Sequence, residues 1–473
     1  MVFSSIIFLL YFLPLFFIVY YFLPIRLRNL WIVLGSIFFY SWGAPKFIMV
    51  ILGTTLLDFF LVKWMDKTQE GNRKKAILTI IVLINIGLLV YFKYSNFFIE
   101  NLNEMLALIG VSGIHWTKLV LPIGISFYTF ETITYVVDVY RKVHKPLDNY
   151  LDYQLYIILF PKLIAGPIIR YHDLADQITD RSRNENLEYR LTGFYRFIIG
   201  LSKKIFIANV LGKHADLVLS TDLALLDTAS AWSGLLAYAF QIYFDFSGYS
   251  DMAIGLCRMM GFVIPENFNS PYVSSSITEY WRRWHISLGS WMKNYLYIPL
   301  GGNRVSNYRH YLNLWLVFLA SGFWHGASWN FIIWGAWHGL FLVIERAFLL
   351  SWYQRAGRFV GTFFTFFFIF VGWVLFRTET LSEAIILYER LFVFTQGFAF
   401  KPDLEFVVIF IVAVFFSFFA WSDAGARIQE RVFAIRIPFK YHIIGTFFSV
   451  LLFILCLSAL SISNFNPFIY FRF

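Results

Sequence analysis

The chain has 473 residues, of which 59% are hydrophobic, 21% are aromatic and only 14% are charged. This composition excludes an ordinary soluble globular protein and is typical of a protein that crosses a membrane many times. The formal net charge of +10 comes from basic residues scattered in loops between apolar segments, which argues against nucleic acid as a partner. We therefore predict an all-α polytopic membrane protein that is embedded in a lipid bilayer.

The first apolar segment, residues 1–24, lacks a basic start and a small-residue cleavage site, so it is predicted to be a membrane helix and not a signal peptide. Basic loops recur between the later apolar segments, at 24–29, 63–75, 140–146, 301–310, 353–358 and 426–440. Because basic loops remain in the cytoplasm, their order predicts an extracytoplasmic N-terminus. The apolar segments suffice for roughly ten to twelve crossings.

The last apolar segment and the central part of the chain lead to two further predictions. The last apolar segment, near 441–463, is predicted to leave the cytoplasm, so the tail 464–473 should be extracytoplasmic. In the central part, 160–305, the apolar segments are interrupted by Pro, Gly and charged residues. Broken helices at membrane depth are tolerated where they are buried in protein or line a wet cavity. We predict one integral membrane domain, 1–473, with its functional centre in 160–340.

Residues 277–304 combine aromatic and basic side chains. A continuous helix is predicted up to Lys293, on which Arg282 and Lys293 point in nearly the same direction and His285 lies on another side. A Gly-Gly turn with Arg304 follows. Such cations could hold the phosphates of a cofactor. The alternative is an interfacial helix that contacts anionic lipid head groups.

His325 lies at the end of a predicted span, residues 310–326, where an ionisable side chain is costly. A neutral imidazole is the usual general base near neutral pH, and the small residues around it leave room for a ligand. The alternative is a structural histidine that bonds across helices. For His338, in the next span, aromatic packing is the better interpretation.

Asp245 and Asp251 are further charged groups in an apolar segment. Either carboxylate could orient a histidine, but we favour structural pairing with a basic residue such as Lys162 or Arg170. Both cysteines lie in apolar segments, so no disulfide framework is predicted. The sequence has neither an H-E-x-x-H motif nor a cysteine cluster, so no metal site is predicted.

Four stretches together resemble the membrane-bound O-acyltransferase family, and within it the bacterial branch that O-acetylates alginate, peptidoglycan and related exported glycans. They are "FPKLIAGPIIRY" at 160–171, "QIYFDFSGYSDMAIG" at 241–255, "FNSPYVSSSITEYWRRWHISLGSWMKNYLYIPLGGNR" at 268–304 and "GFWHGASWNFIIWGAWHG" at 322–339. The last two form the most specific combination. The sequence has "SGFWHG" where relatives often have "GGLWHG".

The resemblance implies a ring of membrane helices around a thin central region that is pierced by a tunnel. It also implies that acyl-coenzyme A enters from the cytoplasm and that the acceptor approaches from the other side. The family's catalytic histidine corresponds to His325, and its second motif histidine corresponds to His285. The location implied is the plasma membrane of a bacterium.

The predicted reaction is acetyl transfer from acetyl-coenzyme A to a glycan hydroxyl, with His325 as the base. Asn330 and the backbone near Gly326 are candidate oxyanion donors. His285 and Asp245 would shape or polarise the site. Candidates for the cofactor phosphates are Arg282, Arg283, Lys293 and Arg304, and candidates for the tunnel wall are Trp324 and Trp329.

Two alternatives remain open from the sequence: a related enzyme that transfers D-alanyl or another acyl group to teichoic acid, and a proton-coupled transporter that uses the same histidines and aspartates. An extracytoplasmic acetylesterase-like partner is expected, because the chain has no large domain outside the membrane to hold a polymer. Tyr470, in the tail "NPFIYFRF", is a candidate acyl relay, since its hydroxyl could accept an acetyl ester and pass it on. The alternative for Tyr470 is an aromatic anchor at the membrane boundary.

Overall fold

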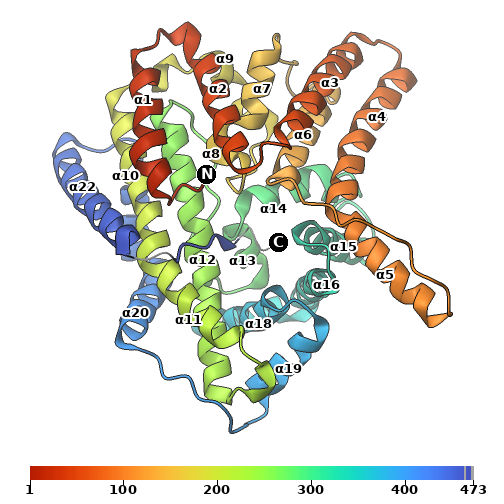
Figure 1. Cartoon of the computed structure of the whole chain (residues 1–473), viewed down its shortest axis with the longest axis vertical. Helices are drawn as coiled ribbons and strands as arrows, with labels where there is room; N and C mark the ends of the chain where they lie inside the picture. The colour runs from red at the N-terminus through yellow and green to blue at the C-terminus, as the bar shows by residue number, and fades with distance from the viewer. Residues whose placement is uncertain (463–464, 470–473) are drawn as a thin grey trace. The chain divides into compact units, whose positions relative to one another are not determined.

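The computed structural model describes residues 1–462 and 465–469, and helices dominate it (Figure 1). Within those ranges there is no regular strand, and one isolated β-bridge pairs Leu226 with Phe398. The prediction of an all-α protein is therefore confirmed. The chain divides into two compact units. Unit 1 is Met1–Glu185 with Gly261–Ile264, and unit 2 is Asn186–Met260 with Pro265–Phe473.

Six helices in the described part of the chain are long and apolar enough to cross a membrane. They are Ile48–Lys67, Gly71–Leu108, Trp329–Tyr353, Arg358–Arg377, Leu404–Trp421 and Phe439–Ile462. A shorter apolar helix covers Phe8–Phe22. These helices confirm a membrane protein with several spans. The larger number of ten to twelve crossings stays a prediction.

Unit 1 contains the N-terminal helices. They are α1 (Leu13–Phe22), α2 (Ile25–Gly43), α3 (Ile48–Lys67), α4 (Gly71–Leu89), α5 (Ser95–Leu108), α6 (Ile125–Tyr140), α7 (Tyr150–Ile158), α8 (Phe160–Leu163) and α9 (Tyr171–Thr179). Helix α6 is almost entirely buried, and its Glu131 forms a buried ion pair with Lys162 of α8. The ring of Phe160, two residues before that lysine, packs among phenylalanines of the apolar helix Phe8–Phe22 and of α2.

Unit 2 contains the remaining helices. They are α10 (Leu187–Ser202), α11 (Asn209–Leu219), α12 (Thr228–Met259), α13 (Ile277–Arg283), α14 (Ile286–Met292), α15 (Asn307–His325), α16 (Trp329–Ile344), α17 (Leu350–Ala356), α18 (Arg358–Arg377), α19 (Leu381–Phe392), α20 (Leu404–Phe418), α21 (Asp423–Phe433) and α22 (Phe439–Ile462). A π-helical segment, η4 (Lys203–Ala208), joins α10 to α11 without a break, and another, η8 (Glu345–Leu349), follows α16. The longest helix, α12, is buried along most of its length.

Helices α10 and α12 lie side by side in unit 2 and approach closely through glycines (Figure 1). A Cβ on Gly200 would lie 2.5 Å from the carbonyl oxygen of Gly248, and a Cβ on Gly255 would lie 2.5 Å from that of Gly193. Small residues at such positions allow two membrane helices to pack backbone against backbone. The pairing fixes α12, which carries Asp245 and Asp251, against α10 and η4.

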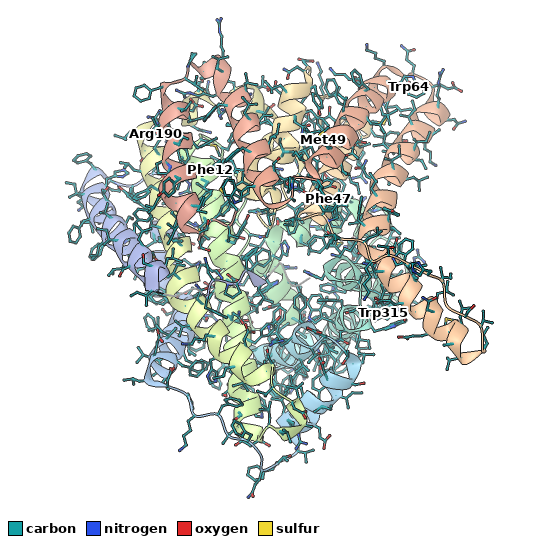
Figure 2. All side chains as sticks on the ribbon, in the orientation of Figure 1. Phe12, Phe47, Met49, Trp64, Arg190 and Trp315 are labelled. Carbon is teal, nitrogen blue, oxygen red and sulfur yellow. The ribbon has the colours of Figure 1, made fainter. Side chains whose placement is uncertain are left out.

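Helices α15 and α16 form a second tight pair, and their junction carries His325. A Cβ on Gly322 would lie 2.2 Å from the carbonyl oxygen of Phe331, and a Cβ on Gly335 would lie 2.4 Å from that of Phe318. Trp315, labelled in Figure 2, lies close to Gly339 of α16, where an added Cβ would be 2.9 Å from its ring. Because α15 ends at His325 and α16 begins four residues later, this packing holds the histidine at a fixed point.

The predicted continuous helix up to Lys293 is wrong. Helix α13 ends at Arg283, Trp284 is extended, and His285 adopts the left-handed conformation with φ 46° before α14 begins at Ile286. A left-handed conformation is uncommon and costly for a residue with a side chain, and it persists where tertiary contacts over-determine it. Here those contacts come from Asn267, which lies upstream in sequence and is fully buried.

Candidate active site

The conformation of His285 is held by hydrogen bonds to Asn267. The backbone carbonyl of Asn267 accepts from the N–H of Ile286 at 3.0 Å. Its side-chain Oδ1 accepts from Ser287, from N–H at 3.3 Å and from Oγ at 2.8 Å, and lies 3.1 Å from His285 Nδ1. The amide Nδ2 donates to Ser250 of α12 at 3.1 Å. Asn267 therefore replaces the helical hydrogen bonds that the break in the chain removes.

These contacts also define the tautomer of His285. The Ser287 N–H can only donate, so it identifies the accepting atom of Asn267 as the oxygen, and His285 Nδ1 must then carry the proton that it shares with this oxygen. In the neutral ring Nε2 is left as an acceptor. His285 is 2% exposed, and its Nε2 has no hydrogen-bond partner within the described residues. The ring thus presents an unused acceptor at a buried position.

His325 lies close to His285. The two imidazole ring centroids are 6.5 Å apart, and Trp324 lies against both, at 5.0 Å from His325 and 6.1 Å from His285. Trp334 and Phe376 pack edge-on against the His325 ring at 5.2 and 5.3 Å. The structure thus brings together two histidines that are 40 residues apart in sequence, and it encloses both in aromatic rings.

A cavity of about 1050 Å³ in unit 2 leads from exposed cations to His285. Its lining includes Arg282, Lys293, Arg304 and Arg346, all of which are exposed, and it includes the buried His285. The Gly301–Gly302 turn and Trp281 complete this part of the wall. Four positive charges at the open end and an imidazole at the buried end suit a long ligand with phosphates at one end and a reacting group at the other.

Three of the four predicted phosphate ligands line this cavity. The fourth, Arg283, does not, because its guanidinium bonds Glu279 at 2.9 Å and the carbonyl of Asn269 at 3.1 Å. Arg346 takes a fourth place in the cavity wall and was missed by the sequence interpretation. The sequence signal for it was the charged pair Glu345–Arg346 inside an otherwise apolar helical segment.

The remaining predicted residues lie around this centre in different ways. The amide nitrogen of Asn330 donates twice to Thr378, to its carbonyl at 2.8 Å and to its hydroxyl at 3.0 Å, and the Gly326 N–H is directed to the carbonyl of Gly322. These candidate oxyanion donors therefore already have acceptors. Trp329 is 52% exposed.

His338 is buried and packs against two tryptophans of unit 2, Trp281 at 4.9 Å and Trp334 at 4.7 Å between ring centroids. Its surroundings are those of a packed aromatic cluster. Among the residues that the structure describes, no three His, Cys, Asp or Glu side chains are grouped so that they could hold a metal ion.

The two aspartates of α12 pair with basic residues, but not with the ones named from the sequence. Asp251 binds Arg196 and Lys203, each at 2.6 Å, and Asp245 binds Lys204 at 2.9 Å. The named candidates have other partners, since Lys162 pairs with Glu131 and Arg170 with Asp173. The expectation of structural pairing was right in kind and wrong in the choice of partners.

Comparison with known proteins shows the family to which the chain belongs. Residues 36–382 match the family model described as "MBOAT, membrane-bound O-acyltransferase family". The matched region is more than half of the chain and contains both histidines and the cavity. The chain belongs to this family, and it is an acyltransferase.

Particular relatives narrow the comparison. The chain is 45% identical over 397 residues to the "Probable alginate O-acetylase AlgI" of Pseudomonas aeruginosa, covering 83% of this chain and 75% of the relative. A protein of the same name from Pseudomonas putida is 40% identical over the full length of both chains. The "Peptidoglycan O-acetyltransferase" of Helicobacter pylori is 38% identical, over 81% of this chain and 78% of its own length. The resemblance drawn from the sequence motifs is confirmed.

Proposed function

We propose that the protein transfers the acetyl group of cytoplasmic acetyl-coenzyme A towards hydroxyl groups of an exported glycan of the alginate or peptidoglycan type. The observation that carries this proposal is the cavity that joins exposed cations to His285, together with the 6.5 Å between the rings of His285 and His325. The names of the relatives support an acetyl donor and a glycan acceptor. On this proposal the chain acts as one acyltransferase domain in a bacterial plasma membrane, with both termini extracytoplasmic.

The donor binds through its phosphates. Arg282, Lys293, Arg304 and Arg346 can pair with the phosphates of coenzyme A, because guanidinium and ammonium groups form charge-assisted hydrogen bonds with phosphate oxygens. The pantetheine arm then extends along the cavity towards the buried end. The unused Nε2 of His285 can accept a hydrogen bond from an amide N–H of that arm, which would hold the thioester beside His325.

The reaction follows from His325 as a neutral imidazole. His325 takes the proton of the acceptor hydroxyl as its oxygen attacks the thioester carbonyl, so that a C–O bond forms. The tetrahedral intermediate then collapses, the C–S bond breaks, and the imidazolium returns its proton to the coenzyme A thiolate. The products are an acetyl ester and free coenzyme A. The aromatic rings around His325 exclude water, which would otherwise hydrolyse the thioester.

The acceptor for this step is a glycan hydroxyl or a relay on the chain itself. Tyr470 lies outside the described residues, and its role as a relay stays a proposal. An acetylesterase-like partner outside the cytoplasm would take the acetyl group from the relay and place it on the polymer.

The test uses inside-out membrane vesicles that contain the protein, its extracytoplasmic partner and its polymer, supplied with acetyl-coenzyme A labelled in the acetyl group. We expect labelled ester on the polymer and an equal amount of free coenzyme A thiol, and we expect His325→Ala to abolish both. His115→Ala is the matched control, because this histidine is exposed in unit 1. Labelled ester at more than a few per cent of the wild-type amount in His325→Ala would overturn the role of this base. A wild-type protein that consumes no thioester would overturn acetyl-coenzyme A as the donor.

A further inference from the structure

A buried ion pair in unit 2 holds the C-terminal tail by its main chain. Lys204 of η4 and Asp245 of α12 lie 2.9 Å apart, and their side chains are only 3% and 1% exposed. The Lys204 ammonium also donates to the carbonyl of Pro467, and the second carboxylate oxygen of Asp245 accepts from the N–H of Ile469 at 2.8 Å. Lys204 thus contacts the residue before Phe468, and Asp245 contacts the residue after it.

The hydrogen-bonding capacity of the pair explains why the tail binds there. An ammonium has three donors and a carboxylate has two accepting oxygens, so the contact between them leaves each group with unused capacity. A buried polar group without a partner is costly, and the cost is higher for a charged group. The carbonyl of Pro467 and the N–H of Ile469 supply the missing partners. These two hydrogen bonds are made by main-chain groups of the tail, so they do not use the side chains of Pro467 and Ile469.

Side-chain contacts fix the position of the docked tail. The ring of Phe468 stacks on Tyr249 with centroids 4.7 Å apart, and Tyr249 lies one helical turn from Asp245 on the same face of α12. Ile469 is 2% exposed and belongs to the apolar core of unit 2. Residues 467–469 are therefore held by both backbone and side-chain contacts.

The docking site adjoins the candidate active site. Phe246 follows Asp245 on α12, and its ring packs edge-on against His285 with centroids 4.8 Å apart. Successive residues of one buried helix thus contact the tail and the second histidine. The described part of the tail ends at Ile469, and the residue that follows it in sequence is Tyr470.

We propose that Lys204 and Asp245 are positioning residues that clamp residues 467–469 of the C-terminal tail, the tail to which the proposed function assigns the acyl relay. The clamp itself stands on the contacts of residues 467–469. Its consequence for acetyl transfer rests on the proposed function. This assignment replaces a direct polarising role for Asp245, since both of its oxygens are engaged by Lys204 and the tail.

The test separates a clamp from a merely structural ion pair by exchanging the two charges. In Lys204→Asp/Asp245→Lys the pair is kept, but the lysine at 245 cannot accept from Ile469 and the aspartate at 204 cannot donate to Pro467. A second variant, Lys204→Met/Asp245→Leu, removes both charges and leaves no buried charge unpaired. It can be measured if the charge-swapped variant does not fold. The matched control is Lys203→Met, because Asp251 keeps its bond to Arg196 and the tail contacts are untouched.

Hydrogen exchange of the tail peptide 465–469 is measured in the full-length protein in detergent, together with coenzyme A binding and polymer acetylation in vesicles. In both double variants we expect exchange at least tenfold faster than in the wild type, unchanged coenzyme A binding and loss of polymer acetylation; the control should match the wild type in all three. Wild-type exchange in either folded double variant would overturn the clamp. Fast exchange with full acetylation would overturn the positioning role. The clamp and the proposed function fail in different ways. If His325→Ala still acetylated the polymer, the proposed function would be wrong, but the hydrogen exchange of the tail would still show the clamp.

Discussion

Replacing Asn267 by alanine tests whether the unusual backbone at His285 is held from outside its own segment. The change removes the acceptor of Ser287 and of His285 Nδ1, and it removes the donor to Ser250. Asn267 is fully buried, so water cannot readily replace these partners. Each orphaned buried group costs about 1–3 kcal/mol. Because three contacts to Asn267 Oδ1 are lost at a buried position, we expect a loss of about 2–5 kcal/mol in the free energy of unfolding.

We expect Asn267→Ala to lower acetyl transfer by more than the smaller amount of folded protein would explain. Without Asn267 the left-handed conformation of His285 loses the contacts that hold it, and the segment can relax towards a continuous helix that turns the imidazole away from the cavity. Thermal unfolding in detergent and acetyl transfer in vesicles measure the two effects. Ser250→Ala is the control, because it removes only the bond to Asn267 Nδ2 and should leave most activity. Wild-type transfer by a folded Asn267→Ala protein would refute this reasoning.

Three further predictions concern the donor, the relay and the packing. Arg282→Glu with Lys293→Glu should weaken coenzyme A binding by about tenfold or more, measured by calorimetry in detergent. Arg283→Ala is the control and should leave binding unchanged, because Arg283 is outside the cavity. Unchanged affinity in the double variant would favour the alternative that this segment contacts lipid head groups. Tyr470→Phe should abolish polymer acetylation with coenzyme A binding intact, whereas full acetylation would leave this residue as an anchor. Gly335→Ala should lower the free energy of unfolding by about 1–3 kcal/mol, since the new methyl group would meet a carbonyl of α15, and an unchanged melting temperature would contradict the close packing.

Much of the fold and of the site could be predicted from the sequence. The length and apolarity of the helical segments depend on local composition, so the membrane class could be recognised. The two motifs that contain His285 and His325 are local and specific, and they identified the family correctly. Three of the four predicted cations line the cavity because they lie close in sequence on either side of one short turn.

The remaining features depend on tertiary contacts that a local pattern does not contain. The residues around His285 favour a helix by themselves, and the break is stabilised by Asn267, 18 residues upstream. Asp245 was expected to pair with a cation, but its partners, Lys204 and the backbone of Ile469, are distant in sequence. No spacing or periodicity links these groups, so only the folded chain could identify them.

On the proposed function, the donor lies in the cavity with its thioester between the two histidines. The most direct measurement is an experimental structure of the full-length protein bound to a non-hydrolysable acetyl-coenzyme A analogue. We expect the phosphates on Arg282, Lys293, Arg304 or Arg346, and the carbonyl carbon close to both His285 and His325. An analogue that occupied another part of the protein, with its carbonyl remote from both imidazoles, would contradict the account.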